Sequence, residues 1–148
     1  MLKHTLPAVI ALCATAVAAS SSDLVHPDLR SDDRHYTSEE WNDLAAGKTL
    51  YYFIDGQFFG REYYGFTGQF VRFQHVSGIC FDGQWWHDAE AQAFCFAWPE
   101  ETSCFHHVAR GDEIVVLSAD QAEDGHWGVQ TVEQITPGGF SCDSALTS

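Results

Sequence analysis

The chain has 148 residues, of which 45% are hydrophobic and 14% aromatic, and its 7 basic and 21 acidic residues give a formal net charge of −14 at pH 7. A charge of this sign repels phosphate backbones and anionic lipids, which argues against binding of nucleic acid. The length is typical of a single domain.

The N-terminus has the pattern of an export signal. Lys3 precedes an apolar run over residues 6–14, and small residues follow at 16–19. We predict a signal peptide over residues 1–19 and a periplasmic or secreted protein. The run is shorter than the roughly 20 residues that a membrane span needs, so no span is expected. A lipid anchor at Cys13 is the less favoured alternative, because Leu12 stands where such sites carry a small residue.

A polar segment and a short helix come next. Residues 20–36 have no apolar period and are predicted to be a flexible lead-in. Thr37 and Glu40 have the spacing of a capping box, Trp41 and Leu44 share a helix face, and Gly47 follows as a stop signal. A helix over residues 38–46 is therefore expected.

From Thr49 the pattern changes to strands rich in aromatic and β-branched residues, separated by turn signals such as Asp55-Gly56. Seven or eight consecutive strands with short connections predict an antiparallel up-and-down meander. We expect a mainly β protein closed into a small lipocalin-like barrel, with a β-sandwich as the alternative. A single domain over residues 37–142 and a tail over 143–148 complete this organisation.

Four cysteines remain after the signal: Cys80, Cys95, Cys104 and Cys142. An even number in an exported chain predicts two disulfides, and the absence of a Cys-x-x-Cys spacing argues against a zinc or redox site. A turn centred on Pro99-Glu100 places Cys95 directly opposite Cys104 on neighbouring strands. This register predicts Cys95–Cys104 and leaves Cys80 to pair with Cys142.

Several short motifs resemble one group of proteins. These are Leu44-Ala-Ala-Gly47 before the strands, Gly83-Gln-Trp85, the Cys-Phe-x-Trp motif over residues 95–98, and Cys104-Phe105. The pattern is similar to that of small exported bacterial domains of unknown function with a lipocalin-like β-meander. The resemblance covers residues 37–135. It implies a fold and a compartment, and it supplies no catalytic residue.

No catalytic residues, metal ligands or cofactor site are predicted. The chain has no Gly-x-Ser-x-Gly motif and no phosphate-binding loop, and no pair of carboxylates is singled out. His87 and His106 could converge across neighbouring strands, but no spacing matches a known metal site. We therefore expect a protein that is not an enzyme.

The aromatic residues of the central strands are the candidate ligand contacts: Trp85, Trp86, Phe94, Phe96 and Trp98. We expect a binding module of unknown specificity that holds a small apolar or aromatic ligand in the barrel. The alternative is a protein-interaction domain, such as an inhibitor or an envelope accessory protein, which would use aromatic side chains on the outer face. The short helix with Trp41 is expected to cover part of that outer face.

Overall fold

The computed structural model describes residues 25–143 of the chain. In chain order its elements are β1 (Arg34–His35), α1 (Ser38–Ala45), β2 (Lys48–Ile54), β3 (Gln57–Tyr64), β4 (Phe70–His75), β5 (Cys80–Asp88), β6 (Ala93–Ala97), β7 (Thr102–Arg110), β8 (Glu113–Ser118) and β9 (Val129–Pro137). The predicted signal peptide over 1–19 and all of the predicted tail except Asp143 lie outside the described residues.

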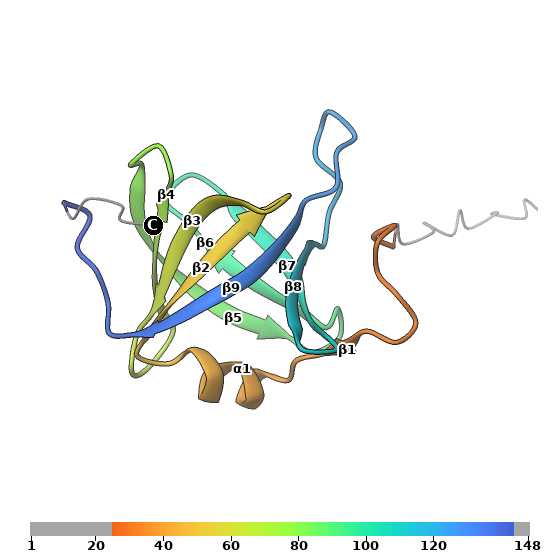
Figure 1. Cartoon of the computed structure of the whole chain (residues 1–148), viewed down its shortest axis with the longest axis horizontal. Coiled ribbons are helices and arrows are strands. Elements are labelled where there is room, and N and C mark those ends of the chain that lie inside the picture. Colours follow the sequence, from red (N-terminus) through yellow and green to blue (C-terminus); the bar gives the residue numbers. More distant parts are fainter. Residues whose placement is uncertain (1–24, 144–148) are drawn as a thin grey trace, which may run out of the picture.

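Strands β2 to β9 form a closed antiparallel barrel of eight strands (Figure 1). Each strand pairs with the next in sequence, and β9 returns to pair with β2. The first hairpin turns at Asp55 and Gly56, both with positive φ, as the predicted two-residue turn requires. The barrel prediction is confirmed, and the sandwich alternative is wrong because the sheet closes on itself.

One end of the barrel is closed by α1, and we call it the closed end. The capping box is present, since the Glu40 amide donates to Thr37 Oγ1 and the Thr37 amide donates to the Glu40 carboxylate. Trp41 is fully buried, and its ring lies 5.9 Å from Tyr64 and 5.6 Å from Phe94 between centroids. Figure 1 shows α1 lying across this end. The other end, where the β2–β3, β4–β5, β6–β7 and β8–β9 connections lie, is called the open end.

The expected role of the helix needs a correction. Tyr64 and Phe94 point into the barrel, so Trp41 extends the interior core and does not cover outward aromatic residues. Trp86, on the outer face, keeps 37% of its surface exposed. The prediction failed because strand periodicity reports which face a residue occupies, but not where along the strand the helix will dock.

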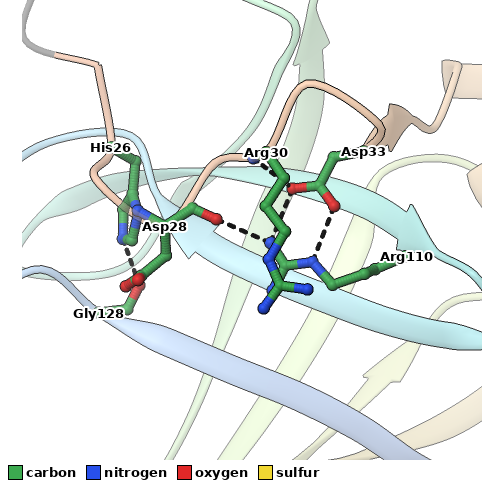
Figure 2. Close-up of polar contacts among 6 residues, drawn as sticks. All are labelled: His26, Asp28, Arg30, Asp33, Arg110 and Gly128. Atoms are coloured by element: carbon green, nitrogen blue, oxygen red, sulfur yellow. Dashed lines mark hydrogen bonds and ion pairs between the residues drawn. The ribbon is translucent and has the colours of Figure 1, made fainter.

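The polar segment before the helix lies along the barrel and forms a strand of its own. Residues 25–33, which we call the N-terminal strap, place Leu29 against the outward apolar side chains of β7 and β8. Arg110 donates two hydrogen bonds to the Asp33 carboxylate, at 2.8 and 2.7 Å, and His26 is hydrogen-bonded to the carbonyl oxygen of Gly128. Figure 2 shows these contacts. The Arg110 hydrogen bonds hold the pKa of Asp33 down at about 2.

These contacts correct the prediction of an unstructured lead-in over the described part, residues 25–36. Strand β1 pairs with β7 at Val108 and Ala109, beyond Phe105, the β7 residue at this end of the pairing with β6. The segment has no apolar period because it is held by polar contacts and by one leucine. Its partners are about 70 to 100 residues away in the sequence, where local patterns give no information.

The C-terminal tail, residues 138–143, runs over the outer face of β3 and β4. Arg72 donates to the Phe140 carbonyl oxygen at 3.0 Å, and Gln74 donates to that of Cys142 at 3.2 Å. The guanidinium of Arg61 lies 4.1 Å from the centre of the Phe140 ring. The Cys80–Cys142 disulfide fastens the tail to the start of β5, near the open end.

Both predicted disulfides are confirmed. Cys95 and Cys104 are direct partners in the β6–β7 register, and they are joined as expected. Two disulfides are typical of proteins that fold in an oxidising compartment. Over residues 25–143, no helix has the length and apolar character required to cross a membrane.

Candidate functional site

The interior of the barrel is divided into a packed half and a hollow half. At the closed end, Trp41, Leu50, Tyr64, Trp85 and Phe94 are all buried in one cluster. Between this cluster and the open end lies a cavity of about 200 Å³. It is lined by Tyr52, Phe59, Glu62, Phe73, Phe81, Phe96, Trp98, Glu101, Ser103, Phe105, His107, Val116 and Gln130.

Aromatic rings form most of the cavity wall. Phe96 and Trp98, from β6 and the residue after it, lie parallel with their ring centres 5.6 Å apart. Trp98 also meets the Phe81 ring edge to face at 5.0 Å, and its indole N–H donates to Ser103 Oγ at 3.1 Å. These contacts hold the rings in place, so the wall is preformed for a flat apolar group.

Two local features of the strands make room for these rings. Opposite β2, Phe59 is an extra residue between Phe58 and Gly60, so β3 carries a bulge and the Phe59 side chain turns into the cavity. A Cβ at Gly83 would lie 2.5 Å from a ring carbon of Trp98. Glycine is therefore needed at 83 for the indole to lie flat against the barrel wall.

A carboxyl group lies at the inner end of the cavity. Glu62, on β3, is only 6% exposed, and its Oε1 accepts a long hydrogen bond of 3.4 Å from the Tyr52 hydroxyl. That hydroxyl is also 3.4 Å from the hydroxyl of Tyr64. Burial raises the pKa of Glu62 to about 7, although the Tyr64 and Tyr52 hydroxyls act to lower it. Glu62 therefore gains or loses its charge near neutral pH.

His107 also lines the cavity but carries no charge. Its ring is stacked on Phe94, with the centres 4.5 Å apart, and it also meets Trp41 at 4.1 Å. Burial lowers the pKa of His107 to about 3, so the ring is neutral at physiological pH. Its Nδ1 atom is buried and has no hydrogen-bond partner within residues 25–143. His107 thus contributes a neutral polar surface to the cavity.

The five predicted ligand contacts divide into three groups. Phe96 and Trp98 line the cavity. Trp85 and Phe94 point inward as well, but they belong to the packed cluster below it. Trp86 points outward and is not part of this site. Alternation along β5 places Trp85 and Trp86 on opposite faces, so both could not contact a ligand in the barrel, and alternation carries no information on depth along the barrel axis.

Sequence reasoning missed Glu62, the most unusual residue of the site. Glu62 and Tyr64 are two residues apart on β3 and therefore share a face, which the buried Tyr64 shows to be the inner one. A charged residue at an inward position of a strand was the signal that could have identified it. Phe59 could not be found in this way, because the bulge shifts it out of the strand's alternation.

The histidines considered for metal binding do not converge. His87 lies on the inner side of β5, 4.6 Å from the Phe94 ring, while His106 lies on the outer side of β7, 5.4 Å from His35. Strand β6 separates β5 from β7, and the two side chains lie on opposite faces of the sheet. Within the described part of the chain, no three His, Cys, Asp or Glu residues are arranged to hold a metal ion.

The fold and the site define a class: a closed eight-stranded antiparallel barrel with an aromatic cavity that ends at a buried carboxyl group. Comparison of the chain with protein-family models, with curated proteins and with solved structures gave no match. The geometry of the cavity is therefore the basis for assigning a function to the protein.

Proposed function

We propose that this protein is an exported, non-enzymatic binding module that holds a small apolar or aromatic ligand inside the barrel. The observation that carries the proposal is the cavity of about 200 Å³, in which six of the lining residues are phenylalanine or tryptophan. Concave sites with apolar walls and few polar groups are the usual form of small-molecule sites in proteins. A closed antiparallel barrel of eight strands is wide enough to hold one small ligand in its interior, which supports the same function.

The size of the cavity limits the ligand. Sites for drug-sized molecules measure roughly 300–1,000 Å³, and this cavity is smaller. A single ring with a short side chain fits this limit, whereas a sterol or a haem would exceed it. The export component of the proposal is supported by the two disulfides and by the signal-like residues 1–19.

The test measures binding of neutral one-ring compounds to the unmodified protein and to a variant in which a large side chain fills the cavity. Titration calorimetry with 2-phenylethanol and 2-cyclohexylethanol is expected to show saturable binding to the unmodified protein. Gln130→Trp places a large ring in the cavity and is expected to abolish it. Thr131→Trp, which adds the same ring to a neighbouring residue that does not line the cavity, is the matched control and should bind normally. Equal binding by both variants, or no binding by the unmodified protein, contradicts the proposal.

The alternative, a protein-interaction domain, has less support. The most exposed large apolar side chains are Phe66, 79% exposed, Val25, 68% exposed, and Ile79, 63% exposed. Phe66 follows β3 at the closed end and Ile79 precedes β5 at the open end, so they do not form a continuous patch. Isolated apolar side chains of this kind are normal on protein surfaces.

A further inference from the structure

We infer that the ligand of this cavity is a small primary amine with one aromatic or apolar ring, whose ammonium group binds the carboxylate of Glu62. This inference rests on the proposed function, because it names the chemical class of the ligand for the same cavity. It is carried by the charges that line the cavity, by the aromatic wall and by the position of Glu62.

The charges that line the cavity favour a cation. Glu62 lies at its inner end and Glu101 in the loop at its mouth, while the described lining residues include no lysine or arginine. His107 is buried and uncharged, so it does not supply a positive charge either. A carboxylate or phosphate ligand would meet only acidic and neutral groups. A cation is attracted both by these groups and by the net charge of −14.

The aromatic wall favours the same ligand class. Glu62 is the direct cross-strand partner of Phe73 in the β3–β4 register, and both line the cavity. An ammonium group at Glu62 therefore lies close to the Phe73 ring, whose face attracts cations. The rings of Phe96 and Trp98 nearer the mouth supply flat surfaces for the apolar body. Such a ligand satisfies the carboxyl end and the apolar wall of the cavity together.

Burial keeps Glu62 a neutral acid at slightly acidic pH, because an unpaired buried carboxylate is costly. An ammonium group removes that cost by forming a charge-assisted hydrogen bond. Below neutral pH the reaction joins the neutral acid and the ammonium into an ion pair and releases one proton from Glu62 to solvent. The other titratable groups facing this end are Tyr52 and Tyr64, whose pKa burial raises well above 10, and the neutral His107; Glu101 is at the mouth.

The test compares 2-phenylethylamine with 2-phenylethanol, which differ only in the terminal group. Calorimetry at pH 8 is expected to show the amine binding roughly tenfold or more tightly than the alcohol. Glu62→Gln keeps the shape of the side chain but cannot become charged, so it should remove this preference and leave alcohol binding nearly unchanged. Glu133→Gln, on the exposed outer part of β9, removes one negative charge away from the cavity and should retain the preference.

A second measurement separates charge pairing from general stabilisation. At pH 6, amine binding measured in two buffers of different ionisation enthalpy should release about one proton per amine, and alcohol binding should release none. Amine affinity should fall by up to roughly tenfold from pH 8 to pH 6 as Glu62 takes up its proton. Circular dichroism of each variant verifies that it is folded.

The outcomes distinguish the two proposals. If the alcohol binds as tightly as the amine, or if Glu62→Gln leaves the preference intact, the amine inference is wrong while the proposed function stands. If neither compound binds the unmodified protein, the amine inference and the proposed function both fail. Amine binding at pH 6 that releases no proton, and that Glu62→Gln does not weaken, also overturns the pairing with Glu62.

Discussion

The two ends of the barrel are built by the same eight strands, yet they are stabilised in different ways. At the closed end, Trp41 fills the interior between Tyr64, Phe94 and His107, so packing holds the strands together from inside. At the open end the interior is hollow, and the barrel is braced from outside by the C-terminal tail and the Cys80–Cys142 disulfide. A barrel can therefore keep a cavity when contacts on its outer wall offset the lost interior packing.

The buried polar groups of the two ends also differ. The closed end buries one neutral imidazole among aromatic rings, and the open end leads inward to a carboxyl group that titrates near neutral pH. At neutral pH the ionisation of this imidazole costs no stability, because the ring is neutral in the folded protein and mostly neutral in the unfolded chain. The carboxyl group costs stability at that pH, which is typical of groups retained for binding.

Trp41 acts as an aromatic plug at the closed end, and its removal is expected to have the largest effect on stability. Trp41→Ala empties the centre of the closed end, and we expect a loss of about 3–5 kcal/mol in the free energy of unfolding, as for other buried tryptophans. Urea titration measures it. Trp86→Ala, on the outer face, should change the free energy of unfolding by less than about 1 kcal/mol. Similar losses for the two variants would show that α1 is not a structural plug.

Removing the external brace tests the open end. Replacement of both Cys80 and Cys142 by serine opens a link between residues 62 apart, and a loss of about 2–5 kcal/mol is expected. Hydrogen exchange should accelerate more in the β4–β5 hairpin than in α1. The equivalent double replacement at Cys95 and Cys104, which are 9 residues apart, should cost less because the closed loop is shorter. Uniform acceleration in the two elements would contradict an open-end brace.

The stability cost of the carboxyl group has a defined pH dependence. The pKa of Glu62 is about 7 in the folded protein and near 4.5 in the unfolded chain, so the folded state binds more protons between these values. The contribution of Glu62 to the free energy of unfolding is fully present below pH 4.5 and is lost as the pH rises through 7. Glu62→Gln should therefore be more stable than the unmodified protein by up to about 3 kcal/mol at pH 8, and similar to it at pH 4.

Thermal unfolding of the two proteins across pH 4–8 measures this difference. His107 destabilises both proteins as the pH falls from 6.5 towards 3, because it stays neutral when folded, and its effect cancels in the comparison. A difference that does not change with pH would show that Glu62 is not titrating inside the barrel.

The smallest expected effect concerns the fit of the aromatic wall. In Gly83→Ala the new Cβ would lie 2.5 Å from the Trp98 ring and 2.6 Å from the Ala97 carbonyl oxygen, so the indole must move. We expect a loss of about 1–3 kcal/mol together with weaker ligand binding. At Gly128 the nearest atom to an added Cβ is 3.5 Å away, so Gly128→Ala is the control and should have little effect. Unchanged binding by Gly83→Ala would mean that Trp98 does not shape the cavity.

Much of the fold was determined by local sequence patterns. Thr37 and Glu40 determined the helix start, Asp55-Gly56 determined the first hairpin, and the alternation through Phe94, Cys95 and Phe96 separated an inner face from a disulfide-bearing outer face. These features are readable because capping, turns and alternation depend on residues within about four positions of one another. The disulfide register followed from the same alternation.

Which part of the barrel is packed and which part is hollow depends on tertiary contacts and could not be predicted from local sequence. Trp85 and Phe96 both point inward and belong to the same buried cluster, but only Phe96 also lines the cavity. The titration of Glu62 likewise depends on Tyr52 from another strand and on burial by the whole barrel. Depth along the barrel axis and burial arise from contacts between distant segments, and strand periodicity records neither.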